Sequence, residues 1–269
     1  MRIVVNNTTT TIRRLLLSLI MITFLSVCDT DEQAFDNEVK VLCINIHAGK
    51  AVNGESNLDA LAELINRLEP DFVALQEVDV NTFRSGGLDM PAILSEKTGM
   101  HYTFGKAMDY QGGYYGNAIL STSGLNNIEN IALPQGQEPR AALKASVRID
   151  GTLPVNIIST HFDSKSEESR VSSASQLNDT FATGQSLSLL IGDLNDTPMS
   201  TTISTLASHW GISDPNGESP TFPATNPTKK IDYIMYYPTN AWRVLQYHVI
   251  EDTNLSDHRP YLVTFKLIR

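Results

Sequence analysis

Carboxylates, imidazoles and amides occur in five short polar clusters, and each cluster directly follows a short apolar segment. The clusters are Asn45-Ile46-His47, Gln76-Glu77-Val78-Asp79, Thr160-His161-Phe162-Asp163, Gly192-Asp193-Leu194-Asn195-Asp196 and Ser256-Asp257-His258. One such cluster alone is usually a solvated turn. Five in one chain indicate a functional site, because ligand-binding side chains of open α/β sheets gather beyond the ends of strands.

The side chains in these clusters favour metal-assisted chemistry on an anionic substrate. Carboxylate and amide oxygens are the ligands that hard divalent cations prefer, whereas a structural zinc site draws on clustered cysteines and histidines. No cysteine pair accompanies the clusters. We therefore expect Mg²⁺ as cofactor, with Mn²⁺ as the alternative.

The segments between the clusters alternate between strand-like and helical patterns. Strands are expected at residues 38–46, 72–75, 102–104, 118–121, 141–149, 155–159, 187–191, 231–235, 242–249 and 262–267. Helices are expected at residues 58–68, with Asn57 as N-cap, and at residues 90–98, 167–181 and 200–208. No internal repeat or linker divides this alternation, so it predicts one α/β domain over residues 38–269.

The composition is that of a globular, acidic protein. Hydrophobic residues make up 41% of the chain, and 30 Asp and Glu stand against 20 Lys and Arg, giving a net charge of -10. Binding of long nucleic acid depends on neutralising phosphates with basic residues. Outside residues 1–28 the longest basic run is Lys229-Lys230, so we expect no long nucleic acid as partner. Nothing indicates a large association surface, and we expect a monomer.

The N-terminus has the pattern of an export signal. Arg13 and Arg14 precede an apolar run over residues 15–27, which is shorter than the ~20 residues of a membrane-spanning helix. Leu25-Ser26-Val27-Cys28 resembles a bacterial lipoprotein cleavage box. We therefore expect residues 1–28 to direct export to the bacterial cell envelope, where a lipid on Cys28 anchors the chain and residues 29–37 form an acidic tether. The alternative is a secreted or periplasmic protein without a lipid.

Seven motifs, in this order, resemble the endonuclease/exonuclease/phosphatase superfamily, the DNase-I-like fold. They are Cys43-Ile44-Asn45-Ile46-His47, Pro70-Asp71-Phe72-Val73-Ala74-Leu75-Gln76-Glu77-Val78, Tyr115-Gly116-Asn117-Ala118-Ile119-Leu120-Ser121, Ser159-Thr160-His161, Ile191-Gly192-Asp193-Leu194-Asn195, Lys230-Ile231-Asp232-Tyr233-Ile234 and Ser256-Asp257-His258-Arg259-Pro260. Residues 104–113 resemble a bacterial branch of this superfamily that is described only as metal-dependent hydrolases. The resemblance implies an α/β (α+β) fold, a four-layer α/β/β/α sandwich of two packed mixed β-sheets flanked by helices.

The resemblance implies a metal site on the oxygen-bearing residues. Glu77 matches the principal metal-ligand glutamate of the family, and Asn45 matches an asparagine beside the metal that helps to position the phosphate. Asp257 is expected near the metal.

The resemblance also implies catalytic roles. Asp193 matches the aspartate that orients or deprotonates the attacking water, and Asn195 matches the amide that holds a phosphate oxygen. His161 and His258 match histidines that contact the phosphate. Asp232 matches the aspartate that hydrogen-bonds the second histidine and favours its charged form.

Other residues are candidates for substrate binding. His47 stands where some relatives carry an aspartate, which weakens the case for a second metal. Asn117 and Tyr115 belong to a motif that often lines the cleft of the family. Arg84 is either a phosphate clamp or a solvated loop arginine, and Arg140 is equally well explained as part of a structural ion pair.

These observations predict a metal-dependent phosphoric ester hydrolase that uses water without a covalent enzyme intermediate. The acidic charge and the export signal favour a phosphodiester of a lipid headgroup or another small molecule as substrate. A secreted endonuclease and a phosphomonoesterase acting on inositol or sugar phosphates are the alternatives among enzymes. A catalytically inactive relative that binds a partner through the same cleft is the alternative outside them.

Overall fold

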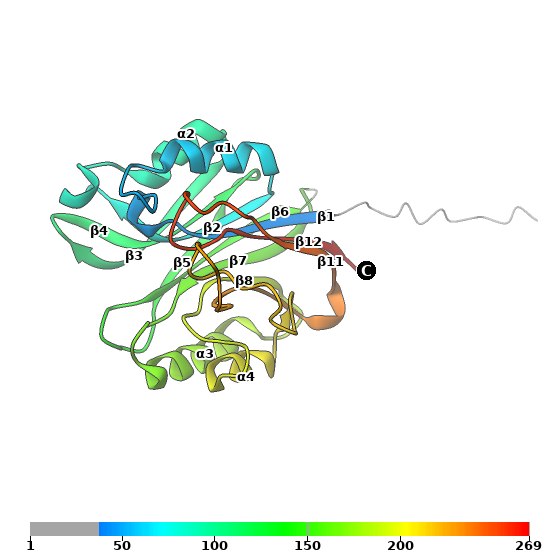
Figure 1. Cartoon of the computed structure of the whole chain (residues 1–269). Coiled ribbons are helices and arrows are strands. Elements are labelled where there is room, and N and C mark those ends of the chain that lie inside the picture. The colour runs from blue at the N-terminus through cyan, green and yellow to red at the C-terminus, as the bar shows by residue number, and fades with distance from the viewer. Residues whose placement is uncertain (1–37, 150, 269) are drawn as a thin grey trace, which may run out of the picture. The chain divides into compact units, whose positions relative to one another are not determined.

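Two mixed β-sheets of six strands each lie face to face in a computed structural model of the chain (Figure 1), which describes residues 38–149 and 151–268. The first sheet has, in spatial order, β11 (Trp242–Val249), β12 (Tyr261–Leu267), β1 (Glu38–Asn45), β2 (Phe72–Val80), β4 (Gly113–Ser121) and β3 (His101–Tyr110). The second has β5 (Asn126–Ala132), β6 (Ala141–Ile149), β7 (Leu153–His161), β8 (Leu187–Asp193), β10 (Asp232–Tyr237) and β9 (Gly211–Ile212).

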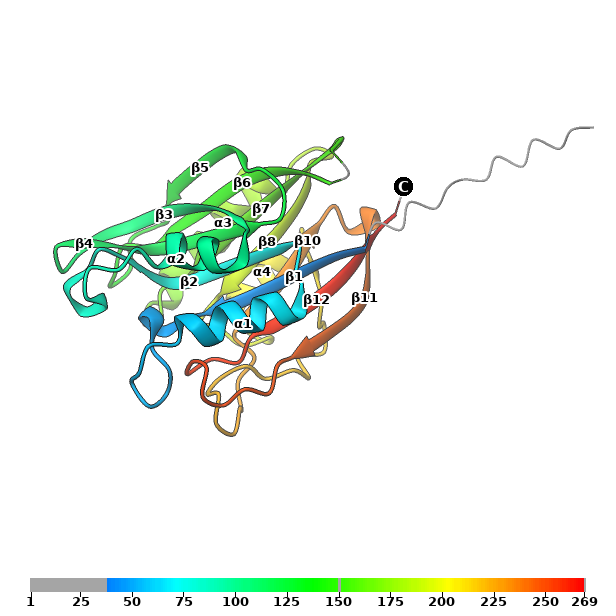
Figure 2. The same cartoon turned by 90° about the horizontal axis from the view of Figure 1, so that it is seen from above.

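Four α-helices cover the outer faces of the two sheets. The helices α1 (Leu58–Leu68) and α2 (Met90–Thr98) share an apolar core with the first sheet, and both lie over its strands when the molecule is seen from above (Figure 2). The helices α3 (Glu167–Phe181) and α4 (Thr201–Ala207) share a core with the second sheet. The prediction of a four-layer α/β/β/α sandwich is therefore confirmed.

The central core lies between the two sheets. Val41, Phe72 and Phe265 of the first sheet meet Ile157 and Ile191 of the second there, all of them buried. Strands with one face toward this core and the other toward a helix are buried on both faces, which explains the unbroken apolar runs of β1 and β8.

The chain turns sharply at three single turns of 3-10 helix, and these turns lie at His47–Gly49, Phe83–Ser85 and Thr239–Ala241. No helix in the described part of the chain is long and apolar enough to cross a membrane. The predicted signal peptide and tether, residues 1–28 and 29–37, lie outside the described residues.

All four expected helices and all ten expected strands occur at the expected places in the described residues, which hold two further strands that were not expected, β5 and β9. β5 carries no buried residue, because it is the edge strand of its sheet, so its sequence lacks the apolar alternation of a core strand. β9 has two residues. Asn57 occupies the N-cap of α1, but its side chain does not cap the helix. It donates instead to the carbonyls of Ile46 and Leu255 and so joins two loops.

Candidate active site

Three of the predicted site residues lie side by side at one end of the second sheet. His161 ends β7 and is in register with Asp193 at the end of the parallel strand β8. Asp232 begins the antiparallel strand β10 and is in register with Asp193 on its other side. The sheet therefore fixes a row of one imidazole and two carboxylates before any side-chain contact is considered.

The first sheet contributes Asn45 and Glu77 to the same place. Glu77 lies at a bulge in β2, where the pairing with β4 shifts between Leu75 and Val78, and its φ of 57° turns it out of the strand. The Nδ2 of Asn45 donates to Glu77 Oε1 at 3.0 Å and to Asp193 Oδ2 at 3.1 Å. This buried amide holds together the carboxylates of the two sheets.

Asp193 is buried and surrounded by hydrogen-bond donors. The backbone N–H of Asn195 donates to its Oδ1 at 2.9 Å, while Oδ2 faces Asn45. Burial, which penalises the charged form, raises the pKa of Asp193 to about 7; nearby Asp232 adds to the rise, and His258 opposes it. A carboxylate with a pKa near neutrality is suited to accept a proton from water.

His258 forms an ion pair with Asp232. The Nδ1 of His258 lies 2.9 Å from Asp232 Oδ2, and its Nε2 lies 3.6 Å from Asp193 Oδ2. Burial alone would lower the pKa of His258, but the two aspartates outweigh it and raise the pKa to about 10. His258 is therefore an imidazolium at neutral pH.

His161 is held in the opposite charge state. The Nη1 of Arg140 lies 3.0 Å from its Nδ1, and a guanidinium can donate but never accept a hydrogen bond. Burial, and then the charges of Arg140 and His258, lower the pKa of His161 well below its ordinary value. His161 is thus neutral, with its proton on Nε2, 3.5 Å from Asp193 Oδ2.

The loop that carries Asp257 and His258 is tied to the rest of the site. Ser256 Oγ donates to the backbone carbonyl of Asn45 at 2.7 Å, and the N–H of Ala224 donates to the carbonyl of Asp257 at 2.7 Å. The ring of Phe222 packs against that of His258, with 4.8 Å between their centroids. These contacts hold the Asp257 carboxylate, 40% exposed, at the edge of the cavity.

Eight of the twelve predicted residues line a cavity of about 330 Å³; they are Glu77, Arg84, Tyr115, His161, Asp193, Asn195, Asp257 and His258. Its lining includes four carboxylates, of Glu77, Glu138, Asp193 and Asp257, and three cationic side chains, of Arg84, Arg140 and His258. Asp79 and Asp232 lie directly behind this lining, bound to Arg84 and His258. The surroundings of the cavity are therefore acidic, and on their own they would repel an anionic substrate.

The donors at the front of the cavity fit a hard divalent cation. Glu77 and Asp257 offer carboxylates, and Asn45 holds Glu77 in place. Beside them, the Nδ1 of His47 is buried without a hydrogen-bond partner among the described residues, 3.8 Å from Asp257 Oδ1. A buried imidazole nitrogen that lacks a hydrogen-bond partner within the described residues, beside the Asp257 carboxylate, is consistent with a cation at this place.

Asp193, Asp232 and His258 form a second group of side chains of the kinds that bind metals. One possible ligand atom from each lies within 4.8 Å of the others. This cluster does not suit a cation, because a protonated His258 has no free lone pair and its Nδ1 already faces Asp232. It is better described as a chain of ion pairs.

Two predicted substrate-binding residues, Arg84 and Tyr115, line the cavity, and both side chains are hydrogen-bonded to other residues of the protein. Arg84 donates from Nε and Nη2 to both oxygens of buried Asp79, at 2.7 and 2.9 Å, so it is not a solvated loop arginine. The hydroxyl of Tyr115 accepts a hydrogen bond from Arg140 at 3.3 Å, and burial raises its pKa.

Asn117 lies elsewhere, which corrects the expectation that it binds substrate. It is buried in β4 behind the cavity and is not part of the lining, and its Nδ2 donates to the carbonyl of Ala141 at 2.9 Å. This bond ties the first sheet to the first residue of β6. Asn117 therefore supports the wall of the site from behind.

Several residues of the lining were not predicted as site residues. Arg140 was weighed as a structural ion pair, and it does pair with Glu138 at 2.9 Å, but it also reaches His161. Asp79, which lies behind the lining and binds Arg84, belongs to the same polar cluster as Glu77, and that proximity was the available signal. Met108 and Tyr110 belong to the segment 104–113 that resembles a branch of the family, whereas no motif marks the remaining lining residues, Glu138, Ser164 and Phe222.

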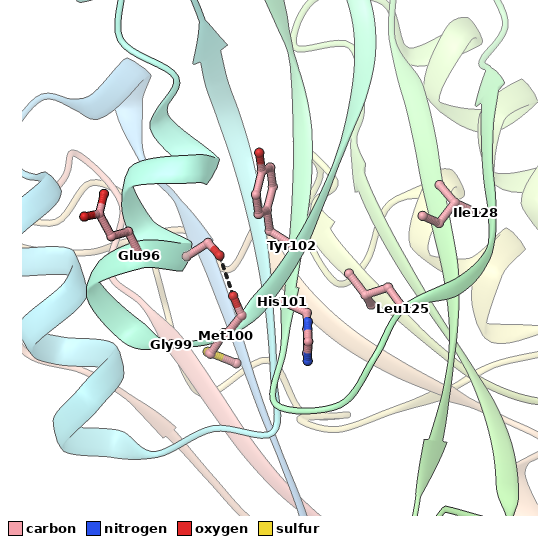
Figure 3. Close-up of a pocket in the computed structure, with 8 residues that line it drawn as sticks. Glu96, Gly99, Met100, His101, Tyr102, Leu125 and Ile128 are labelled. Atoms are coloured by element: carbon pink, nitrogen blue, oxygen red, sulfur yellow. Dashed lines mark hydrogen bonds between the residues drawn. The ribbon is translucent and has the colours of Figure 1, made fainter.

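A second cavity, of about 570 Å³, lies between α2, the start of β3 and the segment that leads into β5 (Figure 3). Its ionisable lining residues are Glu96, His101 and Tyr102, and Figure 3 shows that the side chains of Glu96 and His101 do not point toward each other. This cavity is larger than the first but holds no convergent set of reactive groups.

Comparisons with known proteins agree with the geometry. A model of the Endonuclease/Exonuclease/phosphatase family matches residues 42–258. An endonuclease/exonuclease/phosphatase from Beutenbergia cavernae DSM 12333 is similar with a TM-score of 0.70 and 21% identity, over 86% of this chain and 72% of that chain.

Two further structures of known proteins share the fold. A mannosyl-6-phosphatase from Bacteroides thetaiotaomicron VPI-5482 aligns with a TM-score of 0.70 and 16% identity, over 86% of this chain and 100% of that one. The human Nocturnin catalytic domain with a bound sulfate anion aligns with a TM-score of 0.68 and 20% identity, over 86% of this chain and 95% of that one. At these identities the likeness is one of fold.

Proposed function

Because the chain belongs to the endonuclease/exonuclease/phosphatase family, we propose that it is a divalent-metal-dependent phosphoesterase that hydrolyses a phosphate ester of a small molecule. One observation carries this proposal. Buried Asp193, with a pKa raised to about 7, lies 3.5 Å from neutral His161 and 3.6 Å from the imidazolium of His258. A base between two donors is what attack of water on a phosphate requires.

Glu77 and Asp257 would hold Mg²⁺ or Mn²⁺, with Asn45 orienting Glu77. When bound, the cation withdraws negative charge from the phosphoryl oxygens. It would also offset the acidic lining of the cavity. The excess of carboxylates over cationic side chains supports this part of the proposal.

Asp193 would take a proton from the attacking water as its oxygen bonds to phosphorus. The bond from phosphorus to the alcohol oxygen breaks, and the alcohol leaves with a proton taken from solvent. His258 donates from Nε2 to a phosphoryl oxygen, and Asp232 keeps it charged. His161 donates from Nε2, and the Asn195 amide, whose Nδ2 lies 2.9 Å from that atom, adds a further donor. Donors fixed where negative charge develops stabilise the transition state without reorganising at the moment of reaction.

The size and charge of the cavity favour a small substrate. A volume of about 330 Å³ suits a headgroup or a sugar-sized alcohol. We therefore propose a small phosphate ester, with the phosphodiester of a lipid headgroup and the monoester of a sugar or inositol as the two forms. An endonuclease is disfavoured, because the net charge of -10 gives no field that would attract long nucleic acid.

Other parts of the proposal rest on the sequence. We propose export to the bacterial cell envelope, anchoring through a lipid on Cys28, and action as a monomer. A catalytically inactive binding module is the alternative, and the intact set of Glu77, Asp193 and His258 argues against it.

Phosphorus NMR on the purified protein with a mixed panel of phosphate esters tests this function. The panel holds glycerophospholipids, sphingomyelin, inositol phosphates, sugar phosphates and plasmid DNA. We expect loss of one resonance class with Mg²⁺ or Mn²⁺ and none with EDTA. Consumption of no ester with either cation, while a partner still binds the cleft, would favour the inactive binding module.

A further inference from the structure

One wall of the cavity is a continuous chain of ion pairs and tyrosines. It runs through the residues Asp79, Arg84, Tyr110, Tyr115, Arg140 and Glu138, which we call the ion-pair wall. All of its members except Asp79 line the cavity. It adjoins the reacting centre through the contact of Arg140 with His161.

Tyr115 connects the two arginines of the ion-pair wall. The guanidinium of Arg84 lies 5.5 Å from the centroid of its ring, and Arg140 donates to its hydroxyl at 3.3 Å. Tyr110 lies beside it, with 6.1 Å between the ring centroids, and Arg84 lies 4.5 Å above the Tyr110 ring. The wall is therefore one surface, with positions fixed by contacts among its own members.

The ion-pair wall carries no net charge. Arg84 is neutralised by the two oxygens of Asp79, and Arg140 is neutralised by Glu138. A second phosphate or carboxylate on a substrate would gain little there, since each guanidinium already faces a carboxylate.

The ion-pair wall still offers unused donors and acceptors. Arg84 Nη1 has no hydrogen-bond partner among the residues that the structure describes. The Glu138 side chain is 52% exposed, and only its Oε2 faces Arg140 within the described residues. A neutral surface that both donates and accepts matches hydroxyl groups, each of which does both.

Flat aromatic groups and alkyl chains fit the ion-pair wall less well. Arg84 covers one face of Tyr110, and the Phe222 ring makes a tilted contact with His258, so each ring already has a partner where a nucleobase could stack. Among the lining residues, Met108 is the one aliphatic side chain.

We propose that the ion-pair wall binds the leaving alcohol and selects phosphate esters of polyols, such as sugars, inositols or polyol headgroups. This inference rests on the proposed function for the reacting centre and adds the class of alcohol. Hydroxyls of the polyol donate to Glu138 and accept from Arg84. An ester without hydroxyls leaves these groups desolvated and unpaired, which is the physical origin of the selection.

The test compares a hexose 6-phosphate with hexyl phosphate, which has the same charge and carbon count but no hydroxyls, each also offered as its methyl diester. We expect kcat/KM for the hexose ester to be higher by about tenfold or more. Glu138→Gln should reduce that ratio by about tenfold, mainly through KM, because it removes a charged acceptor. The control Glu129→Gln alters a glutamate of similar exposure that pairs with Lys144 away from the cavity, and it should leave the ratio unchanged.

Binding to the Asp193→Asn chain separates this inference from the proposed function. Saturation-transfer NMR should show tighter binding of the hexose phosphate than of hexyl phosphate, even without turnover. If the hexose phosphate binds more tightly but the native chain hydrolyses no ester, the proposed function would be overturned, while the assignment of the ion-pair wall as a polyol site would be supported. Equal binding of the two ligands, or a preference that survives Glu138→Gln, would overturn the ion-pair wall as a polyol site.

Discussion

Arg140 Nη1 lies 3.0 Å from Nδ1 of His161, and this contact fixes where the proton of His161 resides. An arginine cannot accept a hydrogen bond, so Nδ1 must accept and Nε2 must carry the hydrogen. That N–H then meets the Asn195 amide, whose Nδ2 lies 2.9 Å away. The same Nδ2 also donates to the carbonyl of Phe162 at 3.1 Å, and this bond holds the Asn195 amide beside the ring.

The first prediction concerns the tautomer of His161. Nitrogen-15 NMR of histidine-labelled protein should show a neutral ring with its proton on Nε2 across neutral pH. Arg140→Gln should raise the pKa of His161, because Arg140 is among the causes that lower it. Burial would still hold the pKa below its ordinary value. A spectrum of the native chain with the proton on Nδ1 would contradict this arrangement.

The second prediction concerns Asp232 and the pH profile. Asp232 is the largest cause that raises the pKa of His258, which reaches about 10, so the native enzyme should keep its imidazolium until that pH. Asp232→Asn should lower this pKa, and the alkaline loss of kcat should then begin at a lower pH. At pH 8 we expect a loss on the order of 10²-fold. Profiles of kcat from pH 6 to 10 check this, and an unmoved alkaline limb in the variant would refute it.

The third prediction concerns stability. Lys230 is buried, its Nζ lacks a hydrogen-bond partner within the described residues, and it lies 3.1 Å from the centroid of the Tyr261 ring. Burial lowers its pKa from 10.5 to about 8, which corresponds to a cost of about 3 kcal/mol for the buried charge. Lys230→Met should therefore raise the free energy of unfolding at pH 7, by an amount up to that cost.

The advantage of Lys230→Met should depend on pH in a definite direction. Below pH 8 both the folded and the unfolded native chain carry the proton, so the full cost applies. Between pH 8 and 10.5 the unfolded chain binds the proton and the folded chain does not. The free energy of unfolding of the native chain therefore rises with pH relative to that of the variant. Urea denaturation of both chains at pH 7 and 10.5 measures this, and a less stable variant at pH 7 would show that the ammonium is adequately compensated.

The fourth prediction concerns the cation. Glu77→Gln should weaken binding of Mn²⁺ by at least about tenfold, because a carboxylate ligand is lost. Electron paramagnetic resonance of free Mn²⁺ measures the binding without any substrate. The same change at Glu96, which lines the other cavity, should leave the affinity unchanged. Equal affinities of native chain and Glu77→Gln would place the cation elsewhere.

The sequence predicted the residues at strand ends well because they follow a simple rule. The composition of a buried apolar strand such as β8 identifies it in the sequence. The polar residues at its end and just beyond, Asp193 and Asn195, must then lie at the end of the strand, at the edge of the sheet. The family resemblance supplied the layer order, which periodicity alone does not contain. The edge strand β5 was missed because its residues are solvated and carry no apolar pattern.

Arg140 shows what the sequence could not convey by itself. Its role arises from the hairpin of β6 and β7, in which Ala142 pairs with Thr160, so that the residues just before β6 lie beside His161. The inward contact of Asn117 with Ala141 depends instead on how the two sheets pack, and no local pattern marks it.

The most direct test of the central claim is the rate of phosphate-ester hydrolysis by the Asp193→Asn chain at saturating Mg²⁺. Removal of the base should lower kcat on the order of 10²–10⁴-fold, whereas native rates should disappear with EDTA. Asp196→Asn is the matched control, because Asp196 pairs with Arg170 at 3.0 Å, and it should retain its rate. If Asp193→Asn hydrolyses the ester as fast as the native chain, Asp193 is not the base and the proposed mechanism is wrong.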